Sequence, residues 1–143
     1  MQAFLSAGDS SCTDLPDSSV DVVITDPPFF DNVHYSQLAD FFYYWLNQLL
    51  ELSPKNTTRS TEEVQDTDSA LFTKKLTSVF TECRRVLKED GLLVFTYHHS
   101  RHEGWVAVHE AIRHAGFFVF KPIRSRQKCL FPCPYNRQHL LYT

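Results

Sequence analysis

The pattern of apolar and polar positions predicts a sheet whose strands alternate with helices. Residues 20–25 are almost all apolar or β-branched, which favours a strand covered on both faces, as in a parallel sheet. Similar short apolar runs predict four further strands, at 2–6, 92–97, 117–120 and 138–143.

Between these runs, apolar residues recur every three or four positions, which is typical of amphipathic helices. The pattern predicts three helices, at 33–52, 70–88 and 105–115. Asp68 or Ser69 suits the N-cap of the second helix, and Gly91 and Gly116 suit the ends of the second and third. We expect the first helix to pack its aromatic residues against the sheet as part of the core.

The polar segment 53–68 shows no periodicity and is predicted to be a loop. It is longer than ordinary connections, so both a disordered excursion and a functional lid are compatible with it. The alternation of strands and helices on either side predicts the α/β class. A length of 143 residues corresponds to one domain.

The charge of the chain restricts how it would contact nucleic acid. A formal net charge of −3 excludes a generally basic surface, so phosphate contacts require a local patch. The best candidate is the segment 121–137, which carries basic residues without an acidic one. We predict substrate contacts for Lys121, Arg124 and Arg126, with a solvated hairpin loop as the alternative.

Other compositional features narrow the class of protein. No apolar run approaches about 18 residues and the first residues lack signal-peptide features, so we expect a cytoplasmic protein without membrane contacts. The cysteine positions fit neither a disulfide framework nor the usual zinc spacings, so we predict reduced thiols and no metal site.

The strand at 20–25 ends on the motif Asp26-Pro27-Pro28-Phe29. The prolines cannot donate ladder hydrogen bonds, and Pro27 restricts Asp26 to extended backbone angles. The turn therefore holds the Asp26 carboxylate at the carboxyl end of a strand, where ligands bind in open α/β sheets. A purely loop-stiffening role for the prolines is the alternative.

This motif resembles the Asp-Pro-Pro-Tyr/Phe motif of S-adenosylmethionine-dependent methyltransferases that modify exocyclic amino groups, chiefly N6 of adenine or N4 of cytosine in DNA. The continuation through 30–46 resembles large predicted adenine-specific DNA methylases. The resemblance implies that the Asp26 carboxylate and the Pro27 carbonyl accept hydrogen bonds from the two N–H groups of the base amine. Pro28 belongs to the same catalytic turn, and Phe29 would stack on a base flipped out of the duplex.

Asn32, His34 and Tyr35 lie between the motif and the next predicted helix, near the expected mouth of the pocket. We predict that they contact the base or the cofactor, although Asn32 and Ser36 are equally suited to cap that helix. Two histidines at 98–99 follow the strand at 92–97 and either face the pocket or lie in a surface turn.

A second resemblance concerns the cofactor. Gly8-Asp9-Ser10, followed by Leu-Pro-Asp-Ser-Ser-Val-Asp at 15–21, resembles the segment of Rossmann-like methyltransferases in which an acid contacts the cofactor adenine. Asp9, Ser10 and Asp26 are therefore candidate ligands of S-adenosylmethionine. The alternative is that Asp9 caps a local turn.

The order of elements resembles the catalytic half of a Rossmann-like methyltransferase sheet with its flanking helices. Such enzymes hold the methionine part of the cofactor with a glycine-rich turn, whereas the four glycines here lie far apart. We therefore interpret residues 1–143 as a catalytic half with an incomplete cofactor site and little activity of its own. The other half would precede Met1 or follow Thr143, and the strand edge left open would favour a homodimer.

The predicted function is transfer of a methyl group from S-adenosylmethionine to an exocyclic amino group of a DNA base, with N6 of adenine as the expected target. Methylation of RNA or of a protein amide is a second hypothesis, because related Pro-Pro-aromatic motifs occur there. A catalytically silent binding domain of the same fold is a third.

Overall fold

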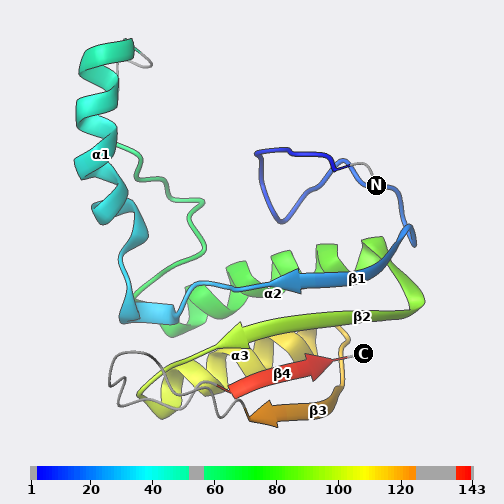
Figure 1. Cartoon of the computed structure of the whole chain (residues 1–143). Helices are drawn as coiled ribbons and strands as arrows, with labels where there is room; N and C mark the ends of the chain where they lie inside the picture. Colours follow the sequence, from blue (N-terminus) through cyan, green and yellow to red (C-terminus); the bar gives the residue numbers. More distant parts are fainter. Residues whose placement is uncertain (1–2, 52–56, 125–137, 143) are drawn as a thin grey trace.

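The computed structural model describes residues 3–51, 57–124 and 138–142, with the backbone alone for 120–124 and 138–142 (Figure 1). It contains strands and helices in alternation, as the α/β prediction requires. The elements in chain order are β1 (Val20–Thr25), the short 3-10 helix η1 (Phe30–Asn32), α1 (Tyr35–Leu50), α2 (Ser69–Val86), β2 (Leu87–Tyr97), α3 (His102–His114), β3 (Val119–Arg124) and β4 (Gln138–Tyr142).

The four strands form one mixed sheet in the order β1-β2-β4-β3. β1 and β2 run parallel, and α1 and α2 lie in the crossover between them, as a parallel pair requires. β4 runs antiparallel to both β2 and β3. β1 is therefore an edge strand, and residues 3–6 form no strand beside it, so the predicted strand at 2–6 is wrong where it is described.

β2 is longer than the predicted strand at 92–97, because it begins at Leu87 directly after α2. Gly91 lies inside this strand and does not end the helix as predicted. A Cβ atom at Gly91 would lie 3.2 Å from the backbone oxygen of Asp21 and 2.9 Å from Cδ2 of Leu87. Glycine therefore permits the close approach of β1 and β2 where their register shifts.

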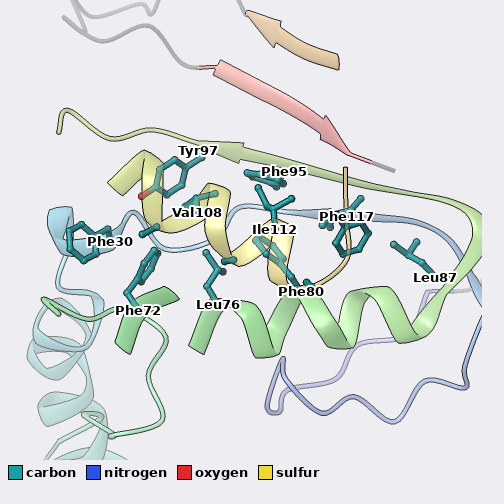
Figure 2. Close-up of a cluster of buried hydrophobic side chains, with 14 residues drawn as sticks. Phe30, Phe72, Leu76, Phe80, Leu87, Phe95, Tyr97, Val108, Ile112 and Phe117 are labelled. Atoms are coloured by element: carbon teal, nitrogen blue, oxygen red, sulfur yellow. The ribbon is translucent and has the colours of Figure 1, made fainter. Parts of the chain in front are cut away.

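The core lies on one face of the sheet, where α2 and α3 pack (Figure 2). Alternate residues of β2 point inward against apolar side chains of the two helices. The buried contributors include Phe72, Leu76 and Phe80 from α2, Leu93, Phe95 and Tyr97 from β2, and Ala107, Val108 and Ile112 from α3. The apolar stripe predicted for 70–88 is thus confirmed, as is its N-cap, since the Asp68 side chain accepts hydrogen bonds from the backbone of Ala70 and Leu71.

The opposite face of β1 is open, which corrects the expectation that this strand is covered on both faces. Ile24 is 78% exposed and Val22 is exposed as well. Both described helices of the core, α2 and α3, contact each other on the other side of the sheet. The apolar run therefore identified a strand correctly but not what covers it.

α1 does not pack against the sheet, so the prediction that its aromatic residues belong to the core is wrong. The helix extends away from the sheet (Figure 1), and its large apolar side chains are exposed: Leu38, Phe41, Phe42, Trp45, Leu46, Leu49 and Leu50. Its polar side is instead held by the following segment, because Asp40 accepts hydrogen bonds from Thr57, Thr58 and Arg59. These bonds, led by the Thr58 backbone, lower the pKa of Asp40 to about 2.

The remaining predicted elements shift by a few residues. α3 begins at His102 instead of 105 and ends before Gly116, whose φ of +82° suits a glycine after a helix. Phe117 is a buried core residue that precedes β3, and β4 occupies the predicted strand at 138–143. The predicted hairpin loop at 125–137 lies outside the described residues. None of the described helices is long and apolar enough to cross a membrane.

Candidate active site

The Asp26 turn lies where β1 ends beside β2. Thr25 pairs with Phe95, and this register brings Asp26 next to Thr96. The Thr96 hydroxyl donates a hydrogen bond to Oδ1 of Asp26. Pro27 is buried, whereas Asp26 is exposed, so the turn is anchored while its carboxylate stays open to a ligand.

Two aromatic residues attach this turn to the core. Phe29 is half-buried, with its ring edge-on to that of Tyr97 at 5.8 Å between centroids. Phe30 is 2% exposed, lies 5.3 Å from the ring of Phe72, and is covered by the guanidinium of Arg101. Phe30 has a φ of +47°, which is uncommon for a bulky residue and costs on the order of 1–3 kcal/mol. Its burial offsets that strain and fixes the direction in which the chain leaves the turn.

A polar cluster surrounds the turn on its C-terminal side. Arg101 bonds Asp31 at 3.0 Å, and His34 lies 3.7 Å from the other oxygen of that carboxylate. The second ring nitrogen of His34 lies 3.4 Å from the Gln65 amide, so the loop after α1 returns to this point. His34 therefore lies near the turn, although it does not line the pocket described below.

Tyr35 is also close to the Asp26 turn. Partial burial raises its pKa, the negative charge of Asp26 adds to the increase, and a hydrogen bond with the Phe29 backbone opposes it. Asn32 is exposed and bonds the Phe29 carbonyl through its backbone N–H. Neither Asn32 nor Ser36 caps α1, whose N-cap position is held by His34 without a capping side-chain bond.

A pocket of about 370 Å³ lies between the Asp26 turn, the N-terminal segment and α2. Ser10, Asp26, Pro27 and Pro28 line it on one side. The α2 side is mainly apolar, with Leu76, Val79, Phe80, Glu82, Cys83 and Val86. Two of the three predicted cofactor ligands thus share one pocket. Asp9 is not among its lining residues. Its carboxylate accepts hydrogen bonds from the backbone and the hydroxyl of Ser11, as in the alternative in which Asp9 caps a local turn.

The N-terminal wall of this pocket depends on two residues that the sequence analysis did not single out. Glu82 accepts hydrogen bonds from the backbone and hydroxyl of Thr13, at 2.8 and 2.6 Å. Arg85 bonds Glu82, Asp17 and the Leu15 carbonyl. The Arg85 guanidinium, followed by Thr13, lowers the pKa of Glu82 to about 2. The signal in the sequence was an acid and a base three positions apart on an amphipathic helix.

Neither of the two histidines after β2, His98 and His99, lines this pocket. His99 is 5% exposed, and its Nδ1 lies 3.0 Å from the Arg101 carbonyl. A Cβ atom at Gly104 would lie 2.5 Å from Cγ of His99, so this glycine allows α3 to approach the ring. The Trp105 indole donates to the His99 carbonyl. His99 therefore joins β2 to α3 and does not line the pocket described above.

The predicted basic patch is only partly described. Arg124 pairs with Gln138, which pairs with Tyr97, so the Arg124 backbone lies at the same end of the sheet as Asp26. Lys121 lies further back along β3, and Arg126 falls outside the described residues. β3 is separated from β1 by two strands, so the backbone positions of Lys121 and Arg124 lie apart from the Asp26 turn.

Comparison with known proteins identifies one family and a set of similar solved structures. The chain matches the N6/N4 methyltransferase family, described as DNA methylase, over residues 20–140. A provisionally assigned DNA modification methylase from Thermus thermophilus has a TM-score of 0.55 at 18% identity, covering 95% of this chain and 51% of its own. A SAM-dependent methyltransferase from Leishmania major has a TM-score of 0.51 at 10% identity, covering 94% and 42%. No curated protein matches the chain.

Proposed function

The chain belongs to the DNA methylase family, and from this premise we propose that it carries the catalytic residues of an enzyme that methylates an exocyclic amino group of a DNA base. N6 of adenine is the proposed target. The observation that carries the proposal is the exposed Asp26 carboxylate, held by Thr96 at the carboxyl end of β1 beside a pocket. The chain spans about half the length of the solved structures it resembles, so the activity is proposed for the complete enzyme.

The proposed chemistry follows from the properties of a base amine. The lone pair of the amine nitrogen is delocalised into the ring, which makes the nitrogen a poor nucleophile. Hydrogen-bond acceptors for its two N–H groups would draw the nitrogen toward tetrahedral geometry and so make the lone pair available. Asp26 would accept a hydrogen bond from one N–H group of the amine and the Pro27 carbonyl would accept one from the other, while Pro28 keeps the turn rigid. Phe29 would stack on the flipped base, and its edge contact with Tyr97 supports a fixed ring position.

The neighbouring polar residues are proposed to bind substrate. Asn32, His34 and Tyr35 lie next to the turn, and the contacts of His34 and Tyr35 support this role. Lys121, Arg124 and Arg126 are proposed to contact DNA phosphates. We further propose that the enzyme works in the cytoplasm, which agrees with its membership of the DNA methylase family.

S-adenosylmethionine is the proposed cofactor, which supplies the methyl group on a sulfonium. The pocket fits part of it, because its apolar α2 wall suits an adenine ring and the Ser10 hydroxyl and Asp26 carboxylate suit polar groups. Asp9 would join them after releasing Ser11. The four glycines of the chain are too widely spaced to form a cradle for the methionine end.

We predict that this chain alone binds S-adenosylmethionine weakly or not at all, because it offers one side of the cofactor site. Calorimetry with the purified chain measures this directly. A dissociation constant in the low micromolar range, or about −8 kcal/mol, would show that the chain completes the site without a glycine cradle.

We also propose that the chain associates with a second copy through the free edge of β1. Among the described strands, none pairs with the outer edge of β1, and such an edge with exposed apolar neighbours such as Ile24 invites strand pairing. Light scattering at micromolar concentration should detect a dimer or larger species. Ile24→Lys should reduce association, whereas Trp45→Lys on α1 should leave it intact. A monodisperse wild-type monomer would contradict the proposal, and a response to Trp45→Lys alone would assign the contact to α1.

Transfer of a radiolabelled methyl group by the complete gene product tests the proposed function. Duplex DNA, RNA and total protein are offered separately, and labelled DNA is digested to nucleosides to identify the modified base. Labelled N6-methyladenine is the expected product. Labelling of RNA or protein would support the second hypothesis, and no labelling despite cofactor binding would support a catalytically silent domain.

A further inference from the structure

The residue that contacts the catalytic carboxylate comes from a different strand, 70 positions along the chain. In β2 the side chains of Phe95 and Tyr97 are buried in the core on either side of Thr96. Because side chains alternate along a strand, Thr96 points to the opposite, open face of the sheet. The pairing of Thr25 with Phe95 sets the Asp26 turn beside it.

This contact determines which carboxylate oxygen remains for a ligand. The Thr96 hydroxyl has one proton to donate, and it donates it to Oδ1 of Asp26. The described ion pairs involve other carboxylates, so no lysine or arginine in the described part of the chain orients Asp26. The terminal torsion of an aspartate is broad and does not fix the carboxylate plane by itself.

We propose that Thr96 is a positioning residue for the methyl transfer reaction. Its hydroxyl bonds Oδ1 of Asp26 and so fixes the plane of that carboxylate. Oδ2 then faces the incoming amine and accepts a hydrogen bond from its N–H group. Thr96 touches neither the base nor the cofactor and acts through Asp26. This inference rests on the proposed function of Asp26. It adds the requirement of a hydroxyl donor at position 96 of β2, which lies outside the Asp-Pro-Pro-Phe motif.

Valine and serine substitutions separate the hydroxyl from the shape of the side chain. Thr96→Val keeps the β-branched form that suits a strand and removes the donor, whereas Thr96→Ser keeps the donor. In the complete enzyme, Thr96→Val should lower kcat about tenfold, the usual size of losing one hydrogen bond to a charged group. The KM values for DNA and cofactor should stay within about twofold, because the loss concerns the transition state.

A matched control and a double variant make the test specific. Thr81→Val removes a hydroxyl that bonds the Thr77 carbonyl on the exposed side of α2, and it should leave kcat unchanged. In an Asp26→Ala background, where single-turnover kinetics measure the residual rate, Thr96→Val should change kcat less than about twofold, because no carboxylate is left for Thr96 to position. Thr96→Ser should restore most of the wild-type rate.

Two results would overturn the positioning role. One is wild-type kcat for Thr96→Val while Asp26→Ala has lost most of its activity, which leaves the proposed function intact. The other is a full tenfold loss from Thr96→Val in the Asp26→Ala background, which would mean that Thr96 does not act through Asp26. If Asp26→Ala itself is fully active, the proposed function of the turn fails instead.

Discussion

Replacing Asp26 by alanine is expected to lower kcat of the complete enzyme about 10²-fold or more, while cofactor affinity changes far less. The carboxylate would stabilise the positive charge that develops on the base nitrogen, so its contribution belongs to the transition state. Loss of one preorganised group of this kind typically costs about 10²–10³ in kcat. Single-turnover methylation of DNA and calorimetry with the cofactor measure the two effects separately.

Asp26→Asn should retain part of the activity, because an amide oxygen still accepts a hydrogen bond after the charge is removed. Asp21→Ala is a matched control on the same strand, since Asp21 is exposed and pairs with Lys88 at the surface. A surface ion pair contributes little, so this variant should behave as wild type. Methylation by Asp26→Ala at the wild-type rate would reduce the turn to a loop stiffener.

The parts of the fold that depend on local chemistry were predictable from the sequence. α2 has an apolar stripe, an aspartate that bonds the first backbone N–H groups and basic residues in the last turn. β1 and its turn are similarly determined by β-branched residues followed by two prolines. Each of these signals acts within a few residues, so no tertiary contact is needed to interpret it.

The parts that depend on a distant partner were not predictable. The periodicity of α1 identifies an apolar face but not what that face contacts, and the segment after the helix covers its polar side instead. The predicted strand at 2–6 would need a neighbouring strand, and the described chain provides none there. Gly91 looked like a helix stop because sequence alone does not show the backbone of Asp21 approaching it.

The same limit applies to the candidate site. Asp26 and Phe29 belong to one motif and could be identified from it. Thr96 bonds Asp26 and Arg101 bonds Asp31 from about 70 positions further along the chain. Their contacts depend on the register of β1 and β2 and on the loop before α3. A threonine in the otherwise apolar run Leu-Leu-Val-Phe-Thr-Tyr was the available signal. It becomes informative once the two strands are aligned.

Two buried phenylalanines of α2 should separate stability from the geometry of the site. Phe72 and Phe80 are both fully buried on the same face of the helix (Figure 2). Replacing either by alanine should lower the free energy of unfolding by about 3–5 kcal/mol through lost burial and the cavity left behind. That is a large share of the roughly 5–15 kcal/mol typical of a domain, and denaturant unfolding of the purified protein measures it.

The two phenylalanines differ in the residues that they contact. Phe72 contacts Phe30, the strained residue that follows the Asp-Pro-Pro-Phe turn, whereas Phe80 contacts Phe95 near the end of β2. Milder leucine variants keep both proteins folded for kinetics. Phe72→Leu should loosen the support of Phe30 and lower kcat several-fold, because small misplacements of a catalytic group are costly. Phe80→Leu should lose comparable stability, and because Phe80 lines the pocket proposed for the cofactor it should raise KM for S-adenosylmethionine, with kcat at saturating cofactor near wild type. Equal kcat for the two variants would mean that the turn is held by its prolines and by Arg101, without help from the core beneath Phe30.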